Sequence, residues 1–140
     1  MLYSKTSKYA VLALSEIARR SKDGAVPTRI IAEAAAVPYP LLAKILVQLK
    51  RAELVTALRG KGGGIQLARS ADLITIRDVV VALDGLGILG DCPLLLEPCT
   101  CEKECPLHPI WRPAHDAVIH FLEATTIQAV ADARELLDAC

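Results

Sequence analysis

Four cysteines and one histidine crowd together in the second half of this chain of 140 residues. They are Cys92, Cys99, Cys101, Cys105 and His108. Thiolates at this density bind a metal, form disulfides or switch between redox states, and a nearby histidine can complete a metal site. The remaining cysteine, Cys140, is the last residue of the chain, and we interpret it as incidental.

An iron–sulfur cluster is one chemistry that these residues could support, because clusters are held by soft, anionic thiolates. A histidine ligand would raise the reduction potential and couple it to pH. A zinc site with three or four of these ligands is the alternative metal, and a metal-free thiol–disulfide switch or inert cysteines also remain open. His108 has a second interpretation as a surface or helix-capping residue, whereas we interpret His115 and His120 as solvated or interface residues.

The overall composition predicts a globular, cytoplasmic protein without a membrane partner. Hydrophobic residues make up 53% of the chain. No run of about 18 apolar residues predicts a membrane span, and the first residues do not resemble a signal peptide. In such a chain, clustered thiols favour metal or redox chemistry over structural disulfides. We find no acid–base or nucleophile constellation, so we do not expect an enzyme.

The net charge of zero hides a division between the two halves. Residues 1–69 carry twelve Lys and Arg against four Asp and Glu, whereas residues 70–140 carry four against twelve. A first half with a charge of about +8 favours contact with a polyanion, most directly nucleic acid.

The basic half has the pattern of a helix-turn-helix. Apolar residues at helical spacing predict helices over residues 6–21, 28–35 and 40–52. Thr28 is expected to cap the second helix, and Pro40 suits the first turn of the third. The third helix has a buried apolar stripe and basic exposed residues, as a DNA-recognition helix does.

A β-hairpin is predicted directly after these helices. Residues 54–58 and 65–67 have the pattern of strands, and the turn between them reads Arg59-Gly60-Lys61-Gly62-Gly63-Gly64. Glycines allow a tight turn and a close approach to another surface. Arg59 and Lys61 would offer cations to phosphates or to a narrow minor groove. The turn lacks the spacing of a phosphate-binding loop.

Three further helices are expected in the acidic half. Thr75 and Asp78 predict a capping box for a helix that ends near residue 84. A longer amphipathic helix is predicted over residues 110–124, and Thr126 is expected to cap a last helix that ends near residue 138. A long amphipathic helix outside the winged part is a natural dimerisation element.

The chain resembles the Rrf2 family of winged-helix transcriptional regulators, in particular its IscR-, NsrR- and RirA-like members. The resemblance covers essentially the whole chain and is carried by SKYAVLAL, RGKGGG, DVVVALDG and CPLHPIW. It implies a homodimer that binds palindromic promoter DNA. It also implies an iron–sulfur cluster in the cysteine loop, for which we favour two-iron two-sulfur over four-iron four-sulfur. In different members this cluster senses cluster supply, nitric oxide or iron.

The ligand set implied by the resemblance is three cysteines separated by five residues each, with a histidine three residues after the last. Cys99, Cys105 and His108 match this spacing, whereas six residues separate Cys92 from Cys99. Cys101 is an additional cysteine, so the middle ligand is either Cys99 or Cys101. NsrR-like members take a ligand from an acidic residue near the N-terminus, where this chain has Lys8, so we favour His108 or the fourth cysteine. The recognition helix also departs from the family pattern, so no operator sequence is carried over.

We therefore predict a mostly α-helical fold with a β-hairpin wing, divided into a winged helix-turn-helix at 1–84, a cysteine loop at 85–108 and dimerisation and C-terminal helices at 109–140. The predicted function is a DNA-binding regulator, in the simplest case a repressor, that senses iron–sulfur, redox or nitric oxide status. A small electron-transfer protein is the alternative of another class, but it would not need a basic wing. The predicted DNA-contacting residues are Lys5, Lys8, Thr28, Tyr39, Lys44, Gln48, Lys50, Arg51, Arg59 and Lys61.

Overall fold

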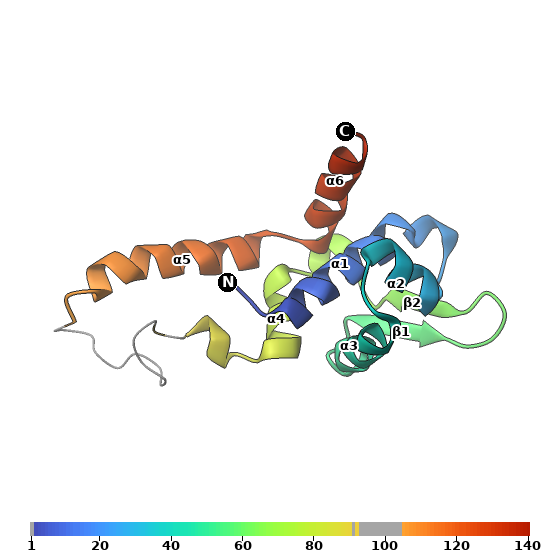
Figure 1. Cartoon of the computed structure of the whole chain (residues 1–140), viewed down its shortest axis with the longest axis horizontal. Coiled ribbons are helices and arrows are strands. Elements are labelled where there is room, and N and C mark those ends of the chain that lie inside the picture. The colour runs from blue at the N-terminus through green and yellow to red at the C-terminus, as the bar shows by residue number, and fades with distance from the viewer. Residues whose placement is uncertain (1, 91, 93–104) are drawn as a thin grey trace.

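The computed structural model describes residues 2–90, 92 and 105–140. The described residues form helices and one antiparallel hairpin, which confirms the predicted fold class (Figure 1). The α-helices are α1 (Lys5–Arg19), α2 (Thr28–Ala35), α3 (Tyr39–Arg51), α4 (Ile76–Asp84), α5 (His108–Ala124) and α6 (Ile127–Asp138). The strands are β1 (Val55–Leu58) and β2 (Gly64–Leu67), and the 3-10 turns are η1 (Ser21–Asp23), η2 (Ala71–Leu73) and η3 (Gly87–Leu89).

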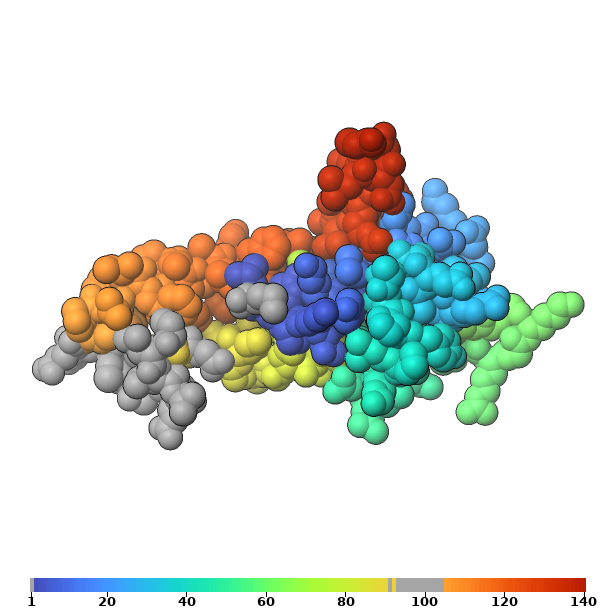
Figure 2. Space-filling view, in the orientation of Figure 1, coloured from blue at the N-terminus to red at the C-terminus, as the bar shows by residue number. Residues whose placement is uncertain are grey.

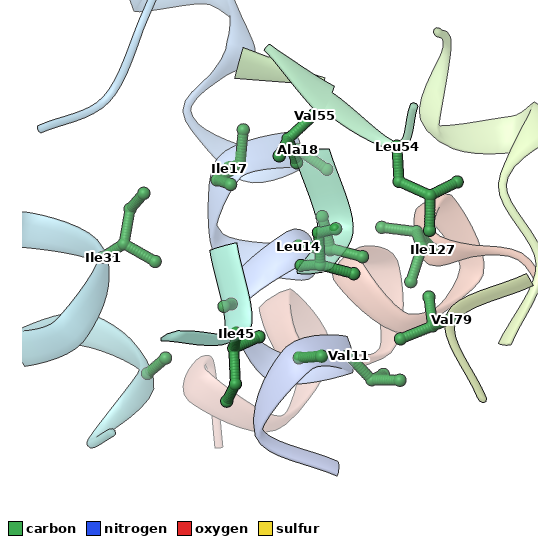
Figure 3. Packing of buried hydrophobic residues seen from close by; sticks show 14 of the residues in the cluster. Val11, Leu14, Ile17, Ala18, Ile31, Ile45, Leu54, Val55, Val79 and Ile127 are labelled. Atoms are coloured by element: carbon green, nitrogen blue, oxygen red, sulfur yellow. The ribbon is translucent and has the colours of Figure 1, made fainter. Parts of the chain in front are cut away.

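The core is built around α1, which packs against α2, α3, α4, α6 and β2. Leu14 and Ile17 of α1 are almost fully buried, at 0% and 1% exposed. Figure 3 shows them among side chains from the surrounding elements, including Ile45 of α3, Val79 of α4 and Ile127 of α6. Burying one such side chain stabilises the fold by about 1.5–3 kcal/mol. This shared core fixes α3 and the hairpin on one body.

Two of the predicted helix caps are confirmed. The Thr75 hydroxyl accepts a hydrogen bond from the Asp78 N–H at 3.1 Å, and the Asp78 carboxylate accepts one from the Thr75 N–H at 2.9 Å. Thr126 likewise accepts a hydrogen bond from the Ala129 N–H at 3.1 Å. These bonds satisfy N–H groups that the first helical turn leaves without a partner.

The predicted cap at Thr28 is wrong. Thr28 is the first residue of α2, and its side chain makes no capping hydrogen bond. Pro27 occupies the cap position with φ −57° and ψ 138°, and its carbonyl accepts hydrogen bonds from the N–H groups of Ile30 and Ile31. The ring of Pro27 restricts its φ to a value that suits the cap position, and Thr28 becomes the first residue of the helix. The other predicted boundaries agree within two residues.

The hairpin pairs Val55 with Leu67 and Leu58 with Gly64, and its turn projects from the body (Figure 2). Gly64 has φ +151°, and a Cβ there would lie 2.4 Å from the Val26 backbone. This close approach allows Val26 and Ile65 to exchange two backbone hydrogen bonds, at 2.7 and 2.8 Å. The start of β2, next to the turn, is thus fixed to the segment that leads into α2.

The two C-terminal helices differ in how they pack. In α6, Ile127 and Ala131 are buried against the core. In contrast, α5 extends away from the body (Figure 1). Leu122, near the end of this helix, is its one buried side chain. Within the described residues, no single helix has both the length and the apolar character needed to cross a membrane, although α2 and α3 would pass that test as a bent pair.

Candidate functional site

The outer side of α3 presents a largely polar surface. Leu42, Ile45 and Leu49 anchor its inner side, each no more than 1% exposed. The predicted contact residues on this helix are all exposed: Tyr39, Lys44, Gln48, Lys50 and Arg51. Val47, which the sequence pattern did not single out, is 50% exposed on the same helix. This surface offers phenol, amide and ammonium groups together with an apolar group, the types of contact that base edges in a major groove accept.

The hairpin turn places two more cations beside this helix. Arg59 and Lys61 are exposed on the turn, and β1 packs against α3. The structure therefore brings the two predicted elements of the DNA interface together on one side of the core (Figure 2).

The other predicted contact residues lie on different helices. Lys5 and Lys8 are exposed in the first two turns of α1, and the Lys5 ammonium lies 5.6 Å from the centre of the Tyr9 ring. Thr28 is half-buried at the start of α2. These side chains can at most add contacts beside the surface formed by α3 and the hairpin.

Of the predicted metal ligands, the described residues include Cys92, Cys105 and His108, all half-buried. Cys99 and Cys101 lie outside the described residues. Among the residues that are described, no three Cys, His, Asp or Glu side chains gather closely enough to hold a metal ion. Cys92, Cys105 and His108 therefore do not lie close enough together in this structure to form a metal site by themselves.

Cys105 and His108 nevertheless form a local pair. The His108 N–H donates a hydrogen bond to the Cys105 carbonyl at 3.1 Å, and the Trp111 N–H donates one to Leu107 at 2.8 Å. These bonds join Cys105 to the first turn of α5, where His108 is the first helical residue. A thiolate and an imidazole one turn apart, both half-buried, are a donor set suited to zinc or to an iron–sulfur cluster.

The N-terminus of α1 is tied to the end of α4, just before the chain enters the cysteine region. The Asp84 carboxylate accepts hydrogen bonds from the Ser4 N–H at 3.1 Å, the Ser4 hydroxyl at 2.5 Å and the Ser7 hydroxyl at 2.8 Å. Burial raises the pKa of Asp84, but the hydrogen bonds from Ser4 and Ser7 outweigh it and hold the pKa below its ordinary value. Asp84 thus fixes the position from which the cysteine region starts.

Replacing Asp84 with Asn is expected to lower the free energy of unfolding by about 1–2 kcal/mol at neutral pH, because charged hydrogen bonds are lost. Since the folded pKa of Asp84 is lowered, its contribution is complete above the unfolded pKa near 3.8 and is lost as the pH falls through the folded value. Urea unfolding of both proteins between pH 7 and pH 3 should show the difference shrinking below about pH 4. The exposed Asp116→Asn variant is the control, and a difference for Asp84→Asn that stays constant over this range would contradict the assignment.

Two side-chain links outside the predicted site had no signal in the sequence pattern. Buried Glu16, in the middle of α1, pairs with Arg134 of α6 at 2.9 Å. His115 of α5 forms a hydrogen bond of 2.5 Å with the Leu89 carbonyl of η3. The first link holds the C-terminal helix on the core, and the second joins α5 to the segment before Cys92. His115, which was expected to be a solvated or interface residue, is thus half-buried and bonded to another segment of the same chain.

Comparisons with known proteins agree in a single direction. Residues 3–133 match the model of the Rrf2 family, described as an iron-dependent transcriptional regulator. The HTH-type transcriptional regulator IscR of Photorhabdus laumondii is 29% identical over 138 residues, which is 99% of this chain and 84% of that protein. The IscR of Pectobacterium carotovorum is 30% identical over the same shares.

Solved structures show the same fold. CymR, the global cysteine regulator of B. subtilis, superimposes with a TM-score of 0.80 at 25% identity, over 93% of this chain and 95% of that one. The oxidized form of Staphylococcus aureus CymR gives 0.72 at 26% identity, over 94% and 96%. T. potens IscR gives 0.73 at 23% identity, over 94% and 86%, and at this identity it supports the fold alone.

Proposed function

Because the chain belongs to the Rrf2 family of transcriptional regulators, we propose that it is a homodimeric, DNA-binding repressor whose affinity for promoter DNA is set by an iron–sulfur cluster. One observation carries this proposal. Cys105 lies just before α5, and His108 is the first residue of this helix. Of the described α-helices, α5 has the fewest buried side chains. On the same core, α3 and the hairpin present a cationic surface. A change at the ligands can therefore reach the dimer contact.

DNA binding is assigned to residues 1–84. We propose that α3 enters the major groove, where Lys44 and Gln48 face base edges and Tyr39 lies at the groove entrance. The hairpin turn places Arg59 and Lys61 against phosphates or in the adjacent minor groove. The remaining contacts to phosphate are assigned to Lys5, Lys8, Thr28, Lys50 and Arg51.

Dimerisation is assigned to residues 109–140, chiefly to α5. Ile110 is 73% exposed and Phe121 is 42% exposed on this helix, and Trp111 is only half-buried. Apolar side chains at this spacing favour burial against a second copy of the helix. A two-fold dimer would present its two α3 helices to palindromic half-sites about 34 Å, one helical turn, apart.

The cluster is assigned to residues 85–108, with Cys92, Cys105 and His108 as ligands and either Cys99 or Cys101 completing the set. When bound, the cluster supplies a centre that responds to oxidation, nitric oxide or iron supply. The protein's own contribution is to hold the ligands at the start of α5, so that ligation biases the orientation of that helix and the spacing of the recognition helices.

A metal-free thiol switch is the second candidate, and the similarity to the oxidized form of S. aureus CymR favours it over zinc. An electron-transfer protein would leave the exposed cations of α3 and the hairpin without a role. The two sensing candidates differ in iron content, so metal analysis of the purified protein separates them.

The test of DNA binding is the Arg59→Ala variant. Duplexes selected by the wild-type protein from a random pool serve as the probe, and binding is measured from 50 to 300 mM salt. Loss of Arg59 is expected to weaken binding about five- to hundredfold and to reduce the slope of log affinity against log salt by about one for each Arg59 in the complex.

Arg77→Ala is the matched control, because Arg77 lies on α4 and pairs with Glu123 at 3.4 Å outside the proposed interface. It should bind as the wild type does. If Arg59→Ala also binds as tightly as the wild type, the hairpin turn has no part in DNA binding. If the wild-type protein selects no sequence, the proposed function is wrong.

A further inference from the structure

We infer that His115 is a positioning residue for the cysteine region: it ties the segment before Cys92 to α5 and so holds the two sides of the ligand set together. This inference rests on the proposed function and adds to it a residue outside the proposed ligand set.

One hydrogen bond joins α5 to η3. His115 Nε2 lies 2.5 Å from the carbonyl oxygen of Leu89, the last residue of η3. Cys92 follows Leu89 by three residues, whereas Cys105 and His108 stand at the start of the helix that carries His115. The bond therefore spans the region that contains the cysteines and connects its beginning to the helix at its end.

The surroundings of His115 show that this position is structured. Its side chain is 30% exposed, and its ring centroid lies 5.9 Å from that of Trp111 at an angle of 51°. Both rings line a cavity of about 240 Å³, together with Gly90, His108, Arg112 and Asp116. The proposed ligand His108 and the positioning residue His115 therefore border the same space as Gly90, which lies two residues before Cys92.

The bond does not require a particular charge on the ring. A carbonyl oxygen only accepts, so Nε2 must carry the hydrogen, and it does so in the imidazolium and in one neutral tautomer. Asp116 Oδ1 is 3.6 Å from His115 Nδ1, beyond ordinary hydrogen-bond length, and its side chain is 65% exposed.

The consequence is a restraint on Cys92 relative to α5. Without the bond, the segment after α4 would be held less firmly relative to α5, and ordering it when a metal binds would cost more conformational entropy. Outer residues that orient metal ligands typically change metal affinity 10- to 100-fold. Because His115 acts through the backbone rather than on a ligand, we expect an effect near the lower limit, about tenfold.

The experiment compares three variants of the full chain, purified without oxygen. His115→Ala removes the bond, His115→Gln retains an N–H donor near the position of Nε2, and His120→Ala is the matched control, because His120 is exposed on the same helix. The rate at which a chelator removes iron is measured by visible absorbance. Amide hydrogen exchange of residues 87–90 is measured in the metal-free proteins.

We expect His115→Ala to lose iron about tenfold faster than the wild type and to exchange faster at residues 87–90. We expect His115→Gln to be restored toward the wild type in both measurements, and His120→Ala to match it. If the wild type holds iron and His115→Ala behaves as His120→Ala does, the inference is wrong and the proposed function stands. If the wild type holds no iron, the proposed function fails and takes this inference with it.

Discussion

Replacing Arg134 with alanine is expected to lower the free energy of unfolding by about 2–4 kcal/mol, a large part of the stability of a domain of this size. Arg134 reaches from α6 into α1, where its guanidinium pairs with Glu16 at 2.9 Å and donates to the Ser15 hydroxyl at 2.8 Å. It also donates to the Leu12 carbonyl at 3.1 Å. The variant removes these three contacts together.

The cost is high because the partner of Arg134 is buried. The Glu16 side chain is 4% exposed, and a buried carboxylate that loses a cation keeps the penalty of leaving water. Arg19 and Arg20 also pair with Glu16, at 3.0 and 3.5 Å, and they moderate the loss. For this reason the expected effect lies below the full cost of breaking an isolated buried pair, about 3–5 kcal/mol.

Urea unfolding at a fixed protein concentration measures this effect, since dimerisation would make stability concentration-dependent. Arg112→Ala is the matched control, because the Arg112 side chain is 70% exposed and lies 3.8 Å from an exposed aspartate. It should change stability by less than about 0.5 kcal/mol. Equal, small effects for both variants would show that Arg134 contributes little to holding α6 on the core.

Replacing Cys105 with alanine is expected to abolish cluster binding. Cys105 is the described cysteine that adjoins α5, and a hydrogen bond from the His108 N–H to its carbonyl keeps the two residues on one turn. Thiolates are the ligands that hold iron–sulfur clusters, and removal of one leaves an incomplete set. The visible absorbance and iron content of the anaerobically purified variant should fall to background.

Cys140→Ala is the control for this prediction, because Cys140 is exposed at the end of the chain. It should keep the full iron content. Cys99→Ala and Cys101→Ala purified in parallel would identify the middle ligand, since one of the two should lose the cluster and the other retain it. Full iron content in Cys105→Ala would remove this residue from the proposed ligand set.

Local patterns predicted most of the fold. The capping box of Thr75 and Asp78 depends on residues three positions apart, and the hairpin follows from glycines flanked by short apolar segments. Such signals are contained in one segment of the chain, so the elements were predicted with boundaries within two residues. The helix at residues 28–35 also has its predicted bounds, but Thr28 does not cap it, because Pro27 stands at the cap position and Thr28 is the first helical residue.

The long-range links could not be predicted in the same way. Glu16 and Arg134 lie at opposite ends of the chain, and many charged residues would have been equally good partners before folding. Asp84 is bonded to Ser4 and Ser7 for a similar reason: only the packing of α1 against α4 brings these groups together. The same applies to His115, whose partner is a backbone carbonyl of η3. Every residue has a backbone carbonyl, so the type of residue cannot indicate this partner.

The sequence indicated which residues could belong to the candidate site, but not how these residues are arranged. Cys105 and His108 were predicted as ligands because they match the spacing of the family. The structure joins them by a backbone hydrogen bond, and their role as ligands stays a prediction. The exposure of α3 residues followed from helical periodicity, whereas the exposed Val47 did not stand out among the other apolar residues of that helix.

Metal analysis of the wild-type protein, purified without oxygen, tests the proposed sensor most directly. Iron, acid-labile sulfide and zinc are measured per chain in the same sample. An iron–sulfur regulator should be brown, with iron and sulfide in equal amounts and little zinc. Colourless protein with about one zinc per chain, or with no metal and intact thiols, would contradict the cluster and leave a zinc-stabilised or thiol-based regulator.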